Sequence, residues 1–260
     1  MKKLFALTLA ALMLLTCFAG CSKAETDSDL QYIQDKGKLV VGITDYAPMD
    51  FKDADGNWTG FDAEFATLFA EELGVDVEFF VLADWGTKFF ELKDKNIDCI
   101  WIGMTISEEV KNNTSCSNPY VKNAQVVVMK ADVAGNYTTK ESLADVAFAA
   151  EIESTGAGAL EDMGIADYVQ TTDMAGALME VSAGTSDACV IDITMAGAMI
   201  GEGTSYTDLT VAMELNSEEY GVGFRQGSDV TAKFNAFMAE LMADGTLDAL
   251  AQKYNLTLVK

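Results

Sequence analysis

The 260-residue sequence predicts an α/β protein made of two lobes. Its composition is 50% hydrophobic and 22% charged, which supports a folded core. Apolar runs typical of strands alternate with segments of helical spacing, and this alternation indicates α/β architecture. Domains contain roughly 100–200 residues, so the length allows two modest lobes. The second half of the chain repeats the strand-and-helix theme of the first.

The first half opens with a predicted strand over residues 38–44, followed by a hairpin through residues 53–58. A helix is expected over residues 61–74, because its phenylalanines and leucines recur at helical spacing and Gly74 follows them. A strand over residues 75–82 completes this unit.

The alternation then continues through the rest of the chain. We expect the following elements: a helix within 85–96, strands over 97–105 and 146–152, helices over about 157–163 and 174–184, a strand over 186–194, a strand over 219–225, and a long helix over 230–244. Short extended segments near residues 121–126 and 213–217 are the expected crossings between the lobes.

Charge and residue usage exclude several functions. The net charge is -24, which would repel DNA and RNA, so no nucleic-acid partner is expected. The chain has no His and only one Arg, Arg225, which removes Ser-His-Asp catalysis and zinc sites built on imidazole. The cysteines show no metal-ligand spacing, and the sequence does not choose partners among Cys99, Cys116 and Cys189. We expect neither a metal nor a cofactor.

The N-terminus has the layout of a secretory signal. Lys2 and Lys3 precede an apolar run over residues 4–15, and small residues precede Cys21. The segment FAGC resembles a bacterial lipobox, with Phe in place of the usual Leu, and this resemblance implies cleavage after residue 20 and lipid on Cys21. Ordinary signal cleavage is the alternative.

Residues 1–20 are therefore the expected lipoprotein signal peptide and residues 21–29 a polar tether. The lipid on Cys21 would anchor the protein outside the cytoplasm, on the bacterial cell membrane.

Seven segments resemble one protein family in their order and spacing. They are GITDYAPMDF, GFDAEFA, IDCIWIGMTISEE, SNPY, EIESTG, SDACVID and YGVGFRQGSD. This order is similar to that of the polar-amino-acid solute-binding proteins of ABC importers, bacterial extracellular solute-binding proteins of family 3. The resemblance covers essentially all of residues 38–260.

The resemblance implies the type II periplasmic-binding-protein fold, with two crossover strands and a ligand closed between the lobes. Lobe 1 would comprise residues 30–122 plus 215–260, and lobe 2 residues 123–214. The expected partners are a small amino acid or cationic amine and the permease subunits of an ABC transporter, and the expected state is a monomer.

Candidate ligand-binding residues follow the ends of predicted strands, where helix N-termini and loops present free backbone groups. Gly103 would let a ligand approach, and the resemblance implies that Met104 and Thr105 hold its ammonium and carboxylate. Ser154 and Thr155 open a helix with a hydroxyl cap, although capping alone would also explain them.

Asp192 and two aromatic residues complete this set. Asp192 ends an apolar strand and would be uncompensated unless it faced the cleft or a helix end; the resemblance pairs it with the ligand's amino group. Tyr46 and Trp85 match family positions that sandwich the ligand's side chain. Trp58 and Trp101 are expected to pack in the core.

One departure from the family concerns the ligand carboxylate. The family's carboxylate-binding Arg aligns with Val110, which cannot form a bidentate ion pair. Glu151 matches a pocket-lining position, so together with Asp192 it makes the predicted cleft acidic. This favours an amine without an α-carboxylate, or an amino acid held mainly by N–H groups near Thr105 and Thr155.

The sequence predicts a lipid-anchored binding protein that delivers its solute to an importer and catalyses no reaction. One alternative is an enzyme on the same scaffold, similar to cyclohexadienyl dehydratase, but its anionic substrates suit an acidic cleft poorly. A second alternative is a sensory lipoprotein that keeps the fold without transport. The sequence names neither the ligand nor the permease.

Overall fold

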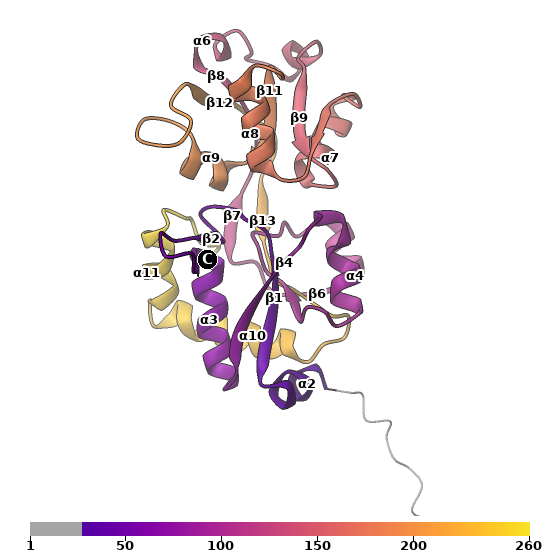
Figure 1. Cartoon of the computed structure of the whole chain (residues 1–260), viewed down its shortest axis with the longest axis vertical. Helices are drawn as coiled ribbons and strands as arrows, with labels where there is room; N and C mark the ends of the chain where they lie inside the picture. The colour runs from indigo at the N-terminus through magenta and orange to yellow at the C-terminus, as the bar shows by residue number, and fades with distance from the viewer. Residues whose placement is uncertain (1–27) are drawn as a thin grey trace, which may run out of the picture.

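The computed structural model describes residues 28–260, which form two α/β lobes, each built around a five-stranded sheet (Figure 1). The predicted signal peptide and the lipidation site at Cys21 lie outside the described residues. The first described helix, α2 (Asp29–Lys36), begins where the predicted tether ends. Ser28 caps it by accepting a hydrogen bond from the backbone N–H of Gln31.

The sheet of the first lobe has the strand order β4-β1-β5-β14-β6. Strands β4 and β5 run parallel to β1, whereas β14 is antiparallel to β5 and β6. Because β14 comes from the C-terminal part of the chain, this lobe is discontinuous in sequence. Its strands are β1 (Lys38–Ile43), β4 (Asp76–Val81), β5 (Cys99–Ile100), β6 (Ser115–Cys116) and β14 (Gly223–Phe224).

Two long helices, α3 (Phe61–Leu73) and α10 (Val230–Ala243), supply five buried phenylalanines to the core of this lobe. The ring centroid of Trp101 lies 5.0 Å from that of Phe65 and 4.9 Å from that of Phe234. Trp101 is fully buried and packs in the core, as expected. The other elements of the lobe are β2 (Phe51–Lys52), β3 (Trp58–Thr59), η1 (Trp85–Thr87), α4 (Lys88–Lys93), α5 (Glu108–Asn113) and α11 (Thr246–Lys253).

The sheet of the second lobe has the order β10-β9-β11-β8-β12. Strand β11 runs parallel to β9 and antiparallel to β8. The strands are β8 (Gln125–Lys130), β9 (Phe148–Glu151), β10 (Val169–Thr171), β11 (Ala188–Asp192) and β12 (Leu209–Glu214). The helices are α6 (Ala131–Ala134), η2 (Lys140–Leu143), α7 (Thr155–Asp162), α8 (Met174–Ala183) and α9 (Ile193–Met199).

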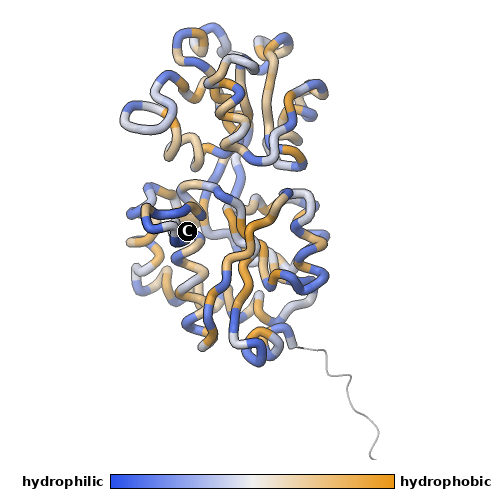
Figure 2. The backbone as a smooth tube through the Cα atoms, in the orientation of Figure 1, coloured by the Kyte–Doolittle hydropathy of each residue, from blue (hydrophilic) through white to orange (hydrophobic). Residues whose placement is uncertain are grey.

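Two antiparallel strands, β7 (Val121–Asn123) and β13 (Glu218–Tyr220), carry the chain between the lobes (Figure 1). Figure 2 shows hydrophilic residues on these crossovers and hydrophobic residues within the sheets. The predicted α/β fold with two crossover strands is therefore confirmed. Of the lobe boundaries that we propose, the one after residue 122 falls within β7, and the one after residue 214 falls between β12 and β13.

Three predicted strands differ from the structure. The strand expected over 186–194 ends at Asp192, where α9 begins, because the apolar run ITMAGAM does not distinguish a strand from a buried helix. The strand expected over 97–105 is a strand only at Cys99–Ile100: residues 101–104 leave the sheet but stay buried, and Thr105 forms an isolated antiparallel bridge with Tyr220. The strand expected over 219–225 is divided between β13 and β14.

Two further findings concern membrane spans and cysteines. Across residues 28–260, none of the helices combines the length and apolar character needed to cross a bilayer. Cys99 and Cys189 are buried, Cys116 is half-buried, and all three are free thiols.

Candidate functional site

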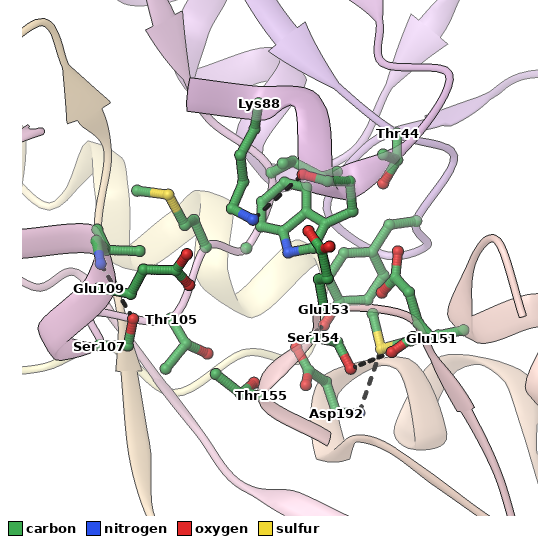
Figure 3. Close-up of a pocket in the computed structure, with 17 residues that line it drawn as sticks. Thr44, Lys88, Thr105, Ser107, Glu109, Glu151, Glu153, Ser154, Thr155 and Asp192 are labelled. Carbon is green, nitrogen blue, oxygen red and sulfur yellow. Dashed lines mark hydrogen bonds between the residues drawn. The ribbon is translucent and has the colours of Figure 1, made fainter. Parts of the chain in front are cut away.

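One cavity between the lobes is lined by all ten residues that the sequence singled out (Figure 3). Lobe 1 contributes Tyr46, Trp85, Gly103, Met104, Thr105 and Val110, and lobe 2 contributes Glu151, Ser154, Thr155 and Asp192. The cavity has a volume of ≈ 60 Å³. At roughly 10–15 Å³ per water position, this is room for about five waters, so the site suits a small solute.

Strand ends explain why these residues meet. Tyr46 follows β1 and Gly103 follows β5, while Glu151 and Asp192 are the last residues of β9 and β11. The carboxyl ends of parallel strands share one edge of a sheet, and the cleft lies outside those edges in both lobes. Residues distant in sequence therefore converge on one cavity.

Asp192 is buried but well compensated. Its carboxylate accepts a hydrogen bond from the Tyr46 hydroxyl at 2.9 Å, and the Tyr220 hydroxyl and the Gln125 amide also donate to it. Burial raises the pKa of Asp192 to about 6, and the hydrogen bond from Tyr220 acts in the opposite direction. The carboxylate faces the cleft as predicted, yet it does not depend on a ligand for compensation.

The carboxylate of Glu151 is buried without the compensation that Asp192 has. Its side chain is only 6% exposed, and its carboxylate has no hydrogen-bond partner within residues 28–260. The pKa of Glu151 is raised to about 8, first by burial and then by the charges of Asp192 and Asp173, while Lys88 acts in the opposite direction. Without a ligand, Glu151 therefore holds its proton at neutral pH. A bound cation would favour the ionised form.

The hydroxyl groups of three predicted residues already have protein partners. Ser154 caps α7 by accepting from the backbone N–H of Ala157 at 3.1 Å, so the capping role is real. Thr105 donates to Glu218 at 2.8 Å, and Thr155 Oγ1 accepts from the amide of Gln125, 2.9 Å away. Thr155 therefore keeps its own O–H to donate to a ligand. Thr105 and Ser154, whose hydroxyl donates to the Glu151 carbonyl oxygen, can only accept from a ligand unless they exchange partners.

Gly103 forms a close contact on the floor of the cleft. Its φ is +51°, and an added Cβ would lie 2.7 Å from Tyr46 Cε1, so a side chain has no room. Its backbone N–H donates to the buried carboxylate of Asp62 at 2.6 Å. Glycine at this position therefore allows Tyr46 to approach the loop that follows β5.

Lys88, the first residue of α4, lines the cavity and was not predicted from the sequence. Its side chain is buried, and its ammonium donates to the Trp85 carbonyl oxygen at 3.2 Å (Figure 3). A signal for it was present in the sequence. Residues three apart share one face of a helical turn, so assigning Trp85 to the cleft also brings Lys88 there.

Val110 lies on α5 and is buried at the cavity wall, so this wall position carries no charge. Arg225 lies elsewhere: its guanidinium pairs with Asp29 at 2.9 Å and with Asp98 at 3.1 Å. It therefore joins structural elements of lobe 1 and does not act as a substitute carboxylate clamp. The further lining residues are Thr44, Ile102, Ser107, Glu109, Glu153 and Met174.

Comparison with known proteins points to one family. The profile described as "Bacterial extracellular solute-binding proteins, family 3" matches residues 39–257. The L-cystine-binding protein TcyJ of Escherichia coli is 29% identical over 95% of this chain and 94% of its own length. The arginine-binding extracellular protein ArtP of Bacillus subtilis is 28% identical over 98% of both chains.

Relatives include a catalytic protein, and solved structures share the fold. Cyclohexadienyl dehydratase of Pseudomonas aeruginosa is 27% identical over 55% of this chain and 53% of its own length. A mutant of ArgBP from T. maritima has a TM-score of 0.80 at 30% identity, covering 87% of this chain and 98% of that one. The ancestral amino acid-binding protein AncCDT-1 has a TM-score of 0.79 at 32% identity, covering 87% and 99%.

Proposed function

Since the chain belongs to the bacterial extracellular solute-binding proteins, family 3, we propose that it captures a small amino acid or cationic amine and delivers it to an ABC importer. The observation that carries this proposal is a cavity lined by residues of both lobes, in which all ten residues expected from the sequence meet. A solute that contacts both lobes stabilises their closed arrangement, which the permease can then distinguish from the open one.

The acidic groups of the cavity support a ligand that carries an ammonium group. Asp192 Oδ1 accepts only from Gln125 among the described residues and retains a free lone pair. Glu151, whose carboxylate has no hydrogen bond in that part of the chain, lines the same cavity. An ammonium between these two residues would ionise Glu151 and satisfy both carboxylates.

Aromatic residues would contact the remainder of the solute. Trp85 is half-buried and lines the cavity from lobe 1, where its ring can pack against an apolar or cationic group. Tyr46 is 2% exposed and offers the edge of a fixed ring. We assign both to positioning of the ligand side chain.

The proposed location is the outer face of the bacterial cell membrane, where lipid on Cys21 would hold a monomeric protein near its permease. Labelling the expressed protein with a radioactive fatty acid tests this assignment. Incorporation that is lost in Cys21→Ser supports the anchor, and equal labelling of both proteins contradicts it.

An enzymatic function is the second candidate, because one relative is a dehydratase and a carboxyl group with a pKa of about 8 can donate a proton. Glu109, Glu151, Glu153 and Asp192 line the cavity, however, and this density of carboxylates disfavours an anionic substrate. Incubation with prephenate followed by product analysis separates the two functions. A new product formed at a catalytic rate would favour the enzyme.

Native mass spectrometry of the protein purified without denaturation tests the binding function directly, because tight binders retain their solute. We expect an additional mass that disappears on unfolding and matches an amino acid or amine, and calorimetric titration with that compound should then show binding. If no amino acid or amine binds and none is retained, the proposed transport function is wrong.

A further inference from the structure

Lys88 is a buried ammonium with few protein partners. Its side chain is 3% exposed, and Nζ makes one hydrogen bond, to the Trp85 carbonyl oxygen at 3.2 Å. Nζ also lies 4.4 Å from the ring centroid of Trp85 and 4.7 Å from that of Phe89. Within residues 28–260, no carboxylate oxygen lies within 4.0 Å of Nζ.

These contacts leave the charge of Lys88 incompletely compensated. An ammonium has three N–H donors, and removing it from water is costly unless an anion or hydrogen bonds replace the water. One carbonyl and two aromatic faces use only part of this capacity. The remaining donors are available to the cavity that Lys88 lines, which is where a ligand would lie.

The free N–H donors of Lys88 are relevant to ligand binding because Lys88 and Val110 line the same cavity. Both side chains line the cavity from lobe 1, on the neighbouring helices α4 and α5. Glu109, next to Val110, makes the largest charge contribution at Lys88, although burial dominates and lowers the pKa of the lysine. The ammonium of Lys88 and the side chain of Val110 therefore line one cavity from the same lobe, and Lys88 supplies a positive charge there that Val110 does not.

We infer that Lys88 receives the α-carboxylate of an amino-acid ligand in this chain, in place of the arginine that the family resemblance expects at position 110. This inference rests on the proposed function and makes it more specific. It orients the ligand, with its carboxylate at Lys88 on lobe 1 and its ammonium at Glu151 and Asp192 on lobe 2. A ligand of this polarity bridges the lobes, so it favours closure.

The alternative, in which Lys88 only neutralises the acidic cavity, predicts the opposite selectivity. Under that alternative, an amine without a carboxylate binds at least as well as its amino acid, since it buries no anion beside Glu109 and Glu151. Under the inference, the amine leaves Lys88 buried without an anion and binds more weakly. A matched pair of ligands therefore separates the two interpretations.

The test uses calorimetric titration of the full expressed chain with each standard L-amino acid and with the amine formed by its decarboxylation, such as L-arginine and agmatine. For at least one pair, we expect wild type to bind the amino acid about tenfold more tightly than the amine, or about 1.4 kcal/mol. Lys88→Met, which keeps the length of the side chain, should abolish this preference.

The control is Lys93→Met, which removes the same charge from an exposed position on the same helix and should leave the preference intact. Both ligands are titrated into the same protein, so the ratio of their affinities does not depend on the fraction of a variant that is folded. Lys88→Arg should restore part of the preference, because it restores the charge.

Three results would overturn the inference. They are equal or tighter binding of the amines by wild type, an equal loss of both ligands in Lys88→Met, and binding of amines without binding of any amino acid. Each of these leaves the proposed transport function standing. If neither class of ligand binds wild type, the proposed function itself fails and the inference fails with it.

Discussion

The hydroxyl of Tyr46 in the first lobe donates a hydrogen bond to Oδ2 of Asp192 in the second lobe, at 2.9 Å across the cleft. The same hydroxyl lies 2.5 Å from Oγ1 of Thr194 and 2.6 Å from the hydroxyl of Tyr220. These groups join a loop of lobe 1, the crossover strand β13 and helix α9 of lobe 2. The ligand site and the contact between the lobes therefore share residues.

Tyr46→Phe should shift the ligand-free protein towards the open arrangement. The variant keeps the ring but loses the hydrogen bond to Asp192, which is worth roughly 1.5–3 kcal/mol when one partner is charged. Small-angle X-ray scattering should report a larger radius of gyration than for wild type. Tyr137→Phe is the control, because this hydroxyl makes no hydrogen bond in the described part of the chain. Identical scattering of wild type and Tyr46→Phe would contradict the proposed contact between the lobes.

Ligand binding should close the lobes further around the solute and change the surroundings of Trp85, which lines the cavity. We expect compaction in small-angle scattering and a change in tryptophan fluorescence at saturating ligand. In Trp85→Phe the fluorescence change should disappear, because neither remaining tryptophan lines the cavity: Trp101 is fully buried in the core and Trp58 lies on β3. An unchanged radius of gyration together with unchanged wild-type fluorescence would argue against closure.

Asp192→Asn should weaken binding of an aminated ligand by roughly 2–5 kcal/mol, since the ligand's ammonium would lose a desolvated partner charge. The amide keeps the shape of the carboxylate, and the tyrosine hydroxyls can still donate to its oxygen. Calorimetry of this variant is compared with Asp167→Asn, which makes the same charge change at an exposed position of lobe 2. Equal affinity of the two variants would place the ammonium elsewhere.

Glu151 should make the stability of the fold depend on pH. Burial raises the pKa of Glu151 to about 8 in the folded protein, against an ordinary value of 4.5. The folded state therefore holds a proton that the unfolded state releases above pH 4.5. The resulting stabilisation is complete below that pH and is lost as the pH rises through about 8.

Urea unfolding across this pH range tests whether protonation of Glu151 contributes to the stability of the fold. In Glu151→Gln the free energy of unfolding should fall less steeply with pH, because one titrating group has been removed. A residual slope should persist, since the pKa of Asp192 is raised to about 6 and that of Asp62 to about 7, both by burial first. A variant with the full wild-type slope would show that Glu151 is ionised in the folded protein.

Adding Val110→Arg to Lys88→Met should restore the preference for amino acids over their decarboxylated amines. A guanidinium at the cavity wall can pair with a carboxylate through two hydrogen bonds, which Val110 cannot do. Relative to Lys88→Met alone, we expect a recovery of about tenfold in the ratio of affinities, about 1.4 kcal/mol. Lys88→Met with Val110→Met controls for side-chain volume, and an equal ratio in both double variants would argue against the guanidinium effect.

Gly103→Ala should destabilise the fold by about 1–3 kcal/mol, because φ is positive there and the new Cβ would collide with the ring of Tyr46. Gly158→Ala provides the contrast. It lies inside α7, has no atom within 4 Å of an added Cβ, and should stabilise by about 0.5–1 kcal/mol. Chemical denaturation measures the free energy of unfolding of both variants. We expect it to fall in Gly103→Ala and to rise in Gly158→Ala, and a fall in both would contradict this prediction.

Local patterns in the sequence were sufficient for much of the fold. The helix α3 was predicted from aromatic spacing and from Gly74, whose left-handed conformation ends it. Strand ends identified Gly103 and Asp192, because a polar or glycine residue after an apolar strand is expected at the sheet edge. Glu151 came instead from the resemblance to the family. These features depend on neighbours along the chain, which the sequence displays directly.

The tertiary structure decided the electrostatics of the cleft. Nothing along the chain places Tyr220 and Gln125 beside Asp192, so only the folded molecule shows that this carboxylate is already compensated while Glu151 is not. The same holds for Lys88, because only the folded molecule shows a buried ammonium in the cavity that Val110 also lines. Residue types and their order determined the family and the lobes. The compensation of each charge depends on distances between residues far apart in sequence, and only tertiary packing sets those distances.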